Sequence, residues 1–259
     1  MNALMILTLI LFGLMVAIGG MKGLRSFIAL FINFFVILLM TLMMIDQNAN
    51  PVYLALAACV VISAVTLFFI NESNVKTKTA FLATVLTTLL LVIFIQFMVE
   101  FVMVGGFSDE EVEGLTIYNF YVGINFVQVM ASVVMMSTIG AVVDEAISIS
   151  SPMYEIHRHH PDMSVKELFD SGMRIGRDLL GTSANTLFFA FFGGYLALLV
   201  RFKDFSYSFG QMLNAKVFSA EMVTILAAGI GVALIVPVTS ILTAYILVRQ
   251  QHKNKESTR

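Results

Sequence analysis

The stretch TAFLATVLTTLLLVIFIQFMVEFVMV, residues 79–104, determines the fold class. It carries one charged residue, Glu100, and is longer than the roughly 20 apolar residues with which a helix crosses the hydrocarbon core of a bilayer. A helix also satisfies all of its backbone hydrogen bonds internally, as lipid surroundings require. The stretch therefore predicts a transmembrane α-helix.

Similar apolar runs fill most of the rest of the chain, at residues 4–20, 26–45, 52–70, 117–150, 179–200 and 219–248. Apolar residues make up 59% of the 259 residues and charged residues only 12%, too few to cover a soluble domain. We therefore predict an all-α, polytopic transmembrane bundle of about seven helices. We expect one transmembrane domain over residues 1–259, with two N-terminal helices in 1–50, a five-helix core in 51–250 and a cytoplasmic tail in 251–259.

Several classes of function are disfavoured by composition. The net charge of −2 argues against nucleic-acid binding, and the single cysteine, Cys59, excludes an internal disulfide and a cysteine-cluster metal site. His157, His159 and His160 follow no strong metal-binding spacing and are interpreted as solvated. The G-x-S-x-G and H-E-x-x-H patterns of hydrolases do not occur. We therefore predict no enzymatic activity, no cofactor and no metal site.

The distribution of Lys and Arg predicts how the chain is oriented, because short cytoplasmic loops are enriched in these residues. The connections between runs fall into two alternating sets, one on each side of the membrane. One set carries twelve Lys and Arg residues and the other carries three. This split predicts an N-terminus outside the cell and a C-terminus in the cytoplasm. The three are Arg201, Lys203 and Lys216, and the twelve are Lys22, Arg25, Lys76, Lys78, Arg158, Lys166, Arg174, Arg177, Arg249, Lys253, Lys255 and Arg259.

The fifth run contains two acidic residues, Asp144 and Glu145, in a stretch that is otherwise apolar or small. An ionisable group within a membrane helix is energetically costly and therefore indicates function. Helical spacing places Asp144 on one face with Gly140, whose lack of a side chain allows close approach of another helix. The same face carries Ser137, Ser148 and Ser151.

The expected partner of this face is a polar stripe on the sixth helix, formed by Asp178, Thr182, Asn185 and Thr186. We predict that Asp144, Asp178, Thr182 and Asn185 meet between the two helices and form an ion-coupling site. Gly140, Gly176 and Gly181 are candidate helix-packing positions. A second interpretation stays open, in which Asp144 lies near the cytoplasmic boundary and is simply solvated. Glu145, about 100° away around the helix, is interpreted as a boundary charge.

Between these helices we expect a cytoplasmic connector. Pro152 closes the apolar part of the fifth run, and the pair Ser164 and Glu167 has the spacing of a capping box that opens a short helix. Apolar or small residues share one face of this helix, which we expect to lie along the membrane surface. They are Val165, Leu168, Phe169 and Gly172.

The chain resembles the YibE/F family of bacterial multi-pass membrane proteins. The matching pieces are GAVVDEAISISSPMYE at 140–155, the G-x-x-x-G-R-D pattern at 172–178, GTSANTL at 181–187 and the glycine pair at 193–194. The resemblance implies a protein of the bacterial plasma membrane. It also implies a homo-oligomer, or a complex with a second YibE/F-like subunit that carries an extracytoplasmic domain.

A more distant likeness is to the membrane domain of SecD, SecF and the RND transporters. Those proteins carry G-x-x-x-D on a helix that runs towards the cytoplasm, here Gly140 to Asp144, followed by a charged connector and a polar helix. In them the matching Asp belongs to a proton or sodium relay. The likeness implies that the chain corresponds to one half of such a domain and that Asp144 couples an ion to transport.

Two functions remain open. One is an ion-coupled, most simply proton-coupled, subunit of a transport or export system, with Asp144 as the titrating intramembrane group. The alternative is a non-transporting membrane scaffold that anchors or assembles a partner protein.

Overall fold

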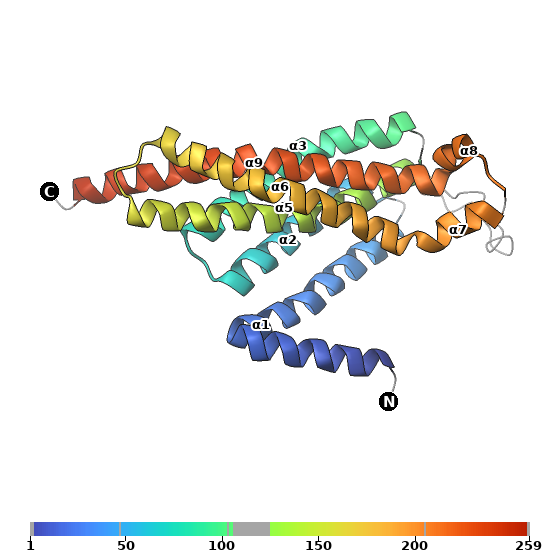
Figure 1. Ribbon diagram of the computed structural model, residues 1–259, viewed down its shortest axis with the longest axis horizontal. Coiled ribbons are helices and arrows are strands. Elements are labelled where there is room, and N and C mark those ends of the chain that lie inside the picture. Colours follow the sequence, from blue (N-terminus) through green and yellow to red (C-terminus); the bar gives the residue numbers. More distant parts are fainter. Residues whose placement is uncertain (1–2, 47, 103, 106–124, 205, 258–259) are drawn as a thin grey trace.

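The computed structural model describes residues 3–46, 48–102, 104–105, 125–204 and 206–257, and these contain helices and no strand. The prediction of an all-α bundle is therefore confirmed for the described part of the chain (Figure 1). The helices are α1 (Ala3–Met43), α2 (Pro51–Ala64), the π-helical segment η1 (Val65–Phe69), α3 (Val75–Val102), α5 (Phe126–His159), α6 (Val165–Gly194), α7 (Leu196–Asp204), α8 (Phe209–Asn214) and α9 (Lys216–Ser257).

Five of the described helical stretches are long and apolar enough to cross a membrane: Ala3–Met43, Pro51–Phe69, Val75–Val102, Phe126–His159 and Lys216–Gln251. Their outward faces carry large apolar side chains such as Phe34, Ile93 and Phe97, each more than 60% exposed. Apolar surface on this scale is unfavourable in water and favourable in lipid. The chain is therefore a helical membrane protein.

The bundle is organised around α5 and α9. Helix α5 packs against α2, α3, α6 and α9, while α9 also packs against α3 and α6. In Figure 1 the long helices α5, α6 and α9 run side by side. Buried Val, Ala and Ile side chains from α3, α5 and α9 fill the space between them, including Val99, Val142 and Ile235.

Helix α1 folds back on itself at Gly20, which has φ 55° and ψ −132°. Glycine adopts this backbone conformation without the steric penalty of a Cβ atom. The two arms approach so closely that a Cβ on Gly23 would overlap the carbonyl group of Met15. The runs predicted at 4–20 and 26–45 thus form two arms of one element, which contacts α2 and η1 and leaves the first arm away from the bundle (Figure 1).

The segment from the connector through the sixth apolar run differs most from expectation. The capping box is confirmed, because Glu167 N–H donates to Ser164 Oγ and Ser164 N–H donates to the Glu167 carboxylate. The helix that it opens is not a short separate element. It continues as α6 to Gly194, since its apolar face, with Leu168 fully buried, packs inside the bundle.

Two further boundaries differ. Helix α5 continues through Pro152 to His159, and α6 ends before the predicted limit of 200, with the short α7 following it. Residues 117–124 of the fifth predicted run lie outside the described residues.

Basic residues from several helices lie at one end of the bundle, here called the basic end. Arg25 pairs with Glu72 at 2.9 Å just before α3, and Lys76 Nζ donates to Ser151 Oγ at 3.4 Å. Arg158 of α5 and Arg249 of α9 lie at the same end, where each lines a pocket that also includes Val75. Helices α7 and α8 lie at the opposite end (Figure 1).

Candidate intramembrane carboxylate site

Asp144 lines an open groove of about 500 Å³ between the second arm of α1, the α2–η1 helix and α5. The groove has mainly apolar walls, and its polar groups come from three different elements. The lining residues are Ser26, Ala29, Leu30, Asn33, Phe34, Ile37, Ile62, Thr66, Ile70, Gly140, Val143 and Asp144.

The polar groups opposite Asp144 are held by a contact between α1 and η1. Asn33 Nδ2 donates to Thr66 Oγ1 at 3.3 Å, and Asn33 Oδ1 is buried with no hydrogen-bond partner among the described residues. Thr66 lies within the π-helical segment, and single π turns within α-helices occur frequently at functional sites. Three separate elements thus bring a carboxylate, an amide and a hydroxyl to one groove.

The Asp144 carboxylate has no hydrogen bond and no ion pair within the described chain. Gly140, one turn earlier on α5, lines the same groove, and a Cβ there would meet nothing within 4 Å. The absence of a side chain at this position leaves open the space beside the carboxylate. A proton, a cation or another donor therefore has room to reach Asp144 from the groove.

The depth of Asp144 follows from neighbouring helices. Ser151 accepts a hydrogen bond from Lys76, which lies at the start of α3 and marks the basic end. Asp144 lies two helical turns before Ser151, about 10 Å further into the bundle. Whether this position lies within the hydrocarbon core, about 30 Å thick, depends on how the bundle sits in the bilayer.

Glu145 is buried, in contrast to its interpretation as a boundary charge. Its side chain is 4% exposed, and its Oε2 accepts a hydrogen bond of 2.8 Å from Ser183 Oγ of α6. Its Oε1 has no partner among the described residues. The interpretation was wrong because position along the chain gave no measure of how closely α6 covers this face.

The predicted meeting of Asp144 with the α6 stripe is also wrong. Asp178, Thr182 and Asn185 are exposed, and none of them lines the groove. Helix α6 packs chiefly against α9, and it approaches α5 where Ser183 meets Glu145. The helical periodicity correctly defined both polar faces but did not define which neighbour each one faces.

The three candidate packing glycines differ in their surroundings. A Cβ on Gly176 would lie 3.0 Å from Cγ2 of Val236 on α9, and closer still to its Cγ1. Gly140 and Gly181 have nothing within 4 Å of such an atom. Gly172, a residue of the matching motif, would place a Cβ 2.7 Å from Ser240 Oγ.

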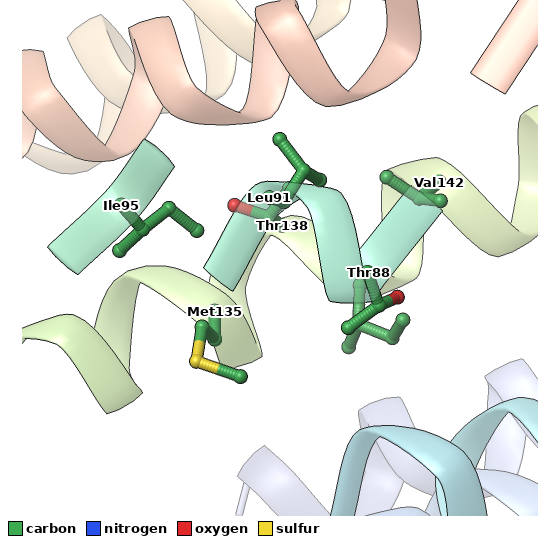
Figure 2. A pocket seen from close by; sticks show the side chains of 7 residues that line it. Thr88, Leu91, Ile95, Met135, Thr138 and Val142 are labelled. Atoms are coloured by element: carbon green, nitrogen blue, oxygen red, sulfur yellow. The ribbon is translucent and has the colours of Figure 1, made fainter. Parts of the chain in front are cut away.

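The interior between α3 and α5 provides no comparable site. Figure 2 shows a space there of about 10 Å³, between Thr88, Leu91 and Ile95 of α3 and residues of α5. Its two hydroxyls donate within their own helices, Thr88 to Thr84 O and Thr138 to Val134 O. This space holds at most about one water molecule. The described residues also contain no group of three His, Cys, Asp or Glu side chains that could hold a metal ion.

Sequence reasoning missed Asn33, Thr66 and Ser183 as parts of these surroundings. Asn33 is the one amide side chain in the apolar run 26–45, and this was a usable signal. Thr66 and Ser183 carried none, because threonine and serine are common in membrane helices and their hydroxyls can bond to their own backbone.

Comparison with known proteins supports the resemblance proposed from the motifs. The chain has no match among the curated proteins and none among the solved structures. A family model described as YibE/F-like protein matches residues 7–249, nearly the full length, including the first two apolar runs. The chain therefore belongs to the YibE/F-like protein family.

Proposed function

We propose that this protein is an ion-coupled, most simply proton-coupled, subunit of a transport or export system, and that Asp144 is its titrating group. The observation that carries the proposal is the Asp144 carboxylate, which has no partner among the described residues and lines a groove of about 500 Å³ between three elements. A charged carboxylate in hydrocarbon is costly. Proton or cation binding removes that charge, so an ion that binds there changes the stability of the groove.

Asn33 and Thr66 are the groups through which α1 and η1 would respond. A protonated carboxyl group is a donor, and Asn33 Oδ1 is an acceptor without a partner in the described chain. A deprotonated carboxylate instead favours donors, which are the Asn33 amide N–H that now donates to Thr66 Oγ1 and the Thr66 hydroxyl itself. Loading and unloading of Asp144 would thereby favour different contacts between α5 and the α1–η1 pair.

The distant likeness to SecD, SecF and the RND transporters supports the same role for Asp144, since Gly140 lines the groove beside it. We further propose that the protein resides in a bacterial plasma membrane with its basic end in the cytoplasm, following the positive-inside rule. In this orientation α5 runs inward, and the N-terminus lies outside.

The test is proton flux in proteoliposomes that contain the full chain with its partner subunit where one co-purifies. We expect Asp144→Asn to reduce flux at least about tenfold, as removal of a relay group does, while membrane insertion is retained. Asp170→Asn is the matched control, because Asp170 is an exposed acid near the start of α6. Full flux in Asp144→Asn would refute the proposal.

A membrane scaffold is the second candidate, and the exposed polar face of α6 favours it. Asp178, Thr182 and Asn185 face away from the rest of the chain, although α6 lies beside spanning helices. Polar side chains at membrane depth are satisfied by other helices, so a second copy or a YibE/F-like subunit would cover this face. If the scaffold role is correct, Asn185→Leu abolishes co-purification of the partner, while Asp144→Asn leaves cellular function intact.

A further inference from the structure

A second pocket lies at the basic end, outside the proposed carboxylate site. It has a volume of about 620 Å³ and lies between the start of α3 and the end of α9. Its cationic groups, Lys78 and Arg249, come from opposite walls. The lining residues are Val75, Lys78, Thr79, Leu82, Tyr245, Ile246, Arg249 and Gln250.

The charge of this pocket is uncompensated. None of its lining residues is acidic, and neither Lys78 nor Arg249 forms an ion pair with any residue that the structure describes. Other basic residues at the same end do have acidic partners, Arg25 with Glu72 and Arg158 with Glu155. An anion would therefore find two unpaired cations in one recess.

Arg249 is held in place before any ligand binds. Its Nη1 donates to Tyr245 Oη at 3.1 Å, and its guanidinium carbon lies 5.7 Å from the centre of the Tyr245 ring. These contacts use one edge and one face of the guanidinium group. The remaining N–H groups have no hydrogen-bond partner among the described residues, and a planar guanidinium matches the spacing of two phosphate oxygens.

The other walls of the pocket are apolar. Val75, Leu82 and Ile246 line it, and Leu82 is 49% exposed. Lys76 and Arg25 are further cations close to the start of α3, and Lys and Arg gather at the cytoplasmic ends of membrane helices, where headgroups meet hydrocarbon. Cations beside apolar walls at that depth match an anionic phospholipid, whose phosphate is adjacent to its acyl chains.

We propose that the pocket between α3 and α9 binds the phosphate of an anionic phospholipid headgroup. Lys78 and Arg249 contact the phosphate oxygens, Gln250 contributes a further polar group, and the acyl chains follow Leu82 and Ile246. The proposal is independent of ion coupling at Asp144.

The test measures lipid binding to the purified full chain in detergent by native mass spectrometry, with dioleoyl phosphatidylglycerol and dioleoyl phosphatidylcholine as probes. We expect phosphatidylglycerol to bind at least about tenfold more tightly than phosphatidylcholine, and Lys78→Gln with Arg249→Gln to remove that preference. Lys166→Gln with Arg174→Gln is the matched control, because it removes the same charge from exposed positions on α6.

The outcomes are distinct. Retained preference in the control and lost preference in the pocket variant support the site, provided that both variants show wild-type circular dichroism and gel-filtration profiles. Equal loss in both variants would show a general charge effect and overturn the proposal. Full competition by millimolar inorganic phosphate would assign the pocket to free phosphate and would also overturn it.

Discussion

Asp144 and Glu145 are neighbours in the chain with different surroundings. Adjacent residues on an α-helix point about 100° apart, so one carboxylate lines the groove beside α1 and the other faces α6. Asp144 has open space beside it, whereas Glu145 has a single protein hydrogen bond in a buried position. The first arrangement suits exchange of an ion, and the second suits fixed contact between helices.

Glu145 provides a test of that fixed contact. We expect Glu145→Ala to lower the free energy of unfolding by about 2 kcal/mol or more, because Ser183 loses its acceptor and the buried side chain leaves a gap. Glu145→Gln keeps a side chain of the same size with an acceptor oxygen. This variant should change the free energy of unfolding by less than about 1 kcal/mol. Unfolding in mixed detergent micelles, followed by circular dichroism, measures both. Equal destabilisation by the two variants would show that the negative charge itself is required.

At the scale of helices, apolar run length predicted most of the elements, because lipid leaves few alternatives to a helix of about 20 residues. It failed at α6, whose polar stripe and charged start obscured a continuous helix from Val165 to Gly194. Periodicity also could not predict the neighbours of each face, since these depend on close contacts such as that of Gly176 with Val236. The groove around Asp144 required α1, which no local pattern places beside α5.

The contact between α6 and α9 can be tested at its glycines. We expect Gly176→Ala to lower the free energy of unfolding by about 1–3 kcal/mol, because a Cβ would collide with the branched side chain of Val236. Gly181→Ala, on the same helix, meets nothing within 4 Å and should be neutral or stabilising by up to about 1 kcal/mol. The same micellar unfolding assay distinguishes them. A neutral Gly176→Ala would mean that the two helices separate easily.

The start of α6 should depend on pH. Hydrogen bonds from the N–H and hydroxyl of Ser164 hold the pKa of Glu167 below its usual range. A lowered pKa means that the stabilisation is present above the unfolded-state pKa, about 4.3, and is lost as pH falls through the folded-state value. Hydrogen exchange of the first turn of α6, measured from about pH 6 to 3, should show increasing opening relative to Glu167→Gln. If the ratio of the exchange rates in the native protein and in Glu167→Gln stays constant with pH, this prediction is contradicted.

For the whole molecule, the arrangement of charge defines two distinct ends. Residues from α1, α3, α5 and α9 make up the basic end, while α7 and α8 lie at the other (Figure 1). The opposite end also carries Arg201, Lys203 and Lys216, but the larger number of Lys and Arg at the basic end favours the proposed orientation. In that orientation, the proposed lipid-binding pocket would lie in the inner leaflet.

This orientation can be measured with single cysteines in a Cys59→Ala background. Gly210→Cys in α8 should react with a membrane-impermeant maleimide in intact spheroplasts, and Lys166→Cys at the start of α6 should react only after permeabilisation. Both positions are exposed. Labelling of Lys166→Cys in intact spheroplasts would reverse the proposed topology.

The fold-back at Gly20 has a consequence for biogenesis. Its arms are joined at a single non-helical residue, so no loop separates the first two apolar segments. The two segments can therefore insert together as one hairpin, and in the proposed orientation Lys22 and Arg25 beside the bend would keep it on the cytoplasmic side. Because α1 precedes α5 in the chain, insertion in the order of synthesis would place one wall of the Asp144 groove in the membrane before the carboxylate.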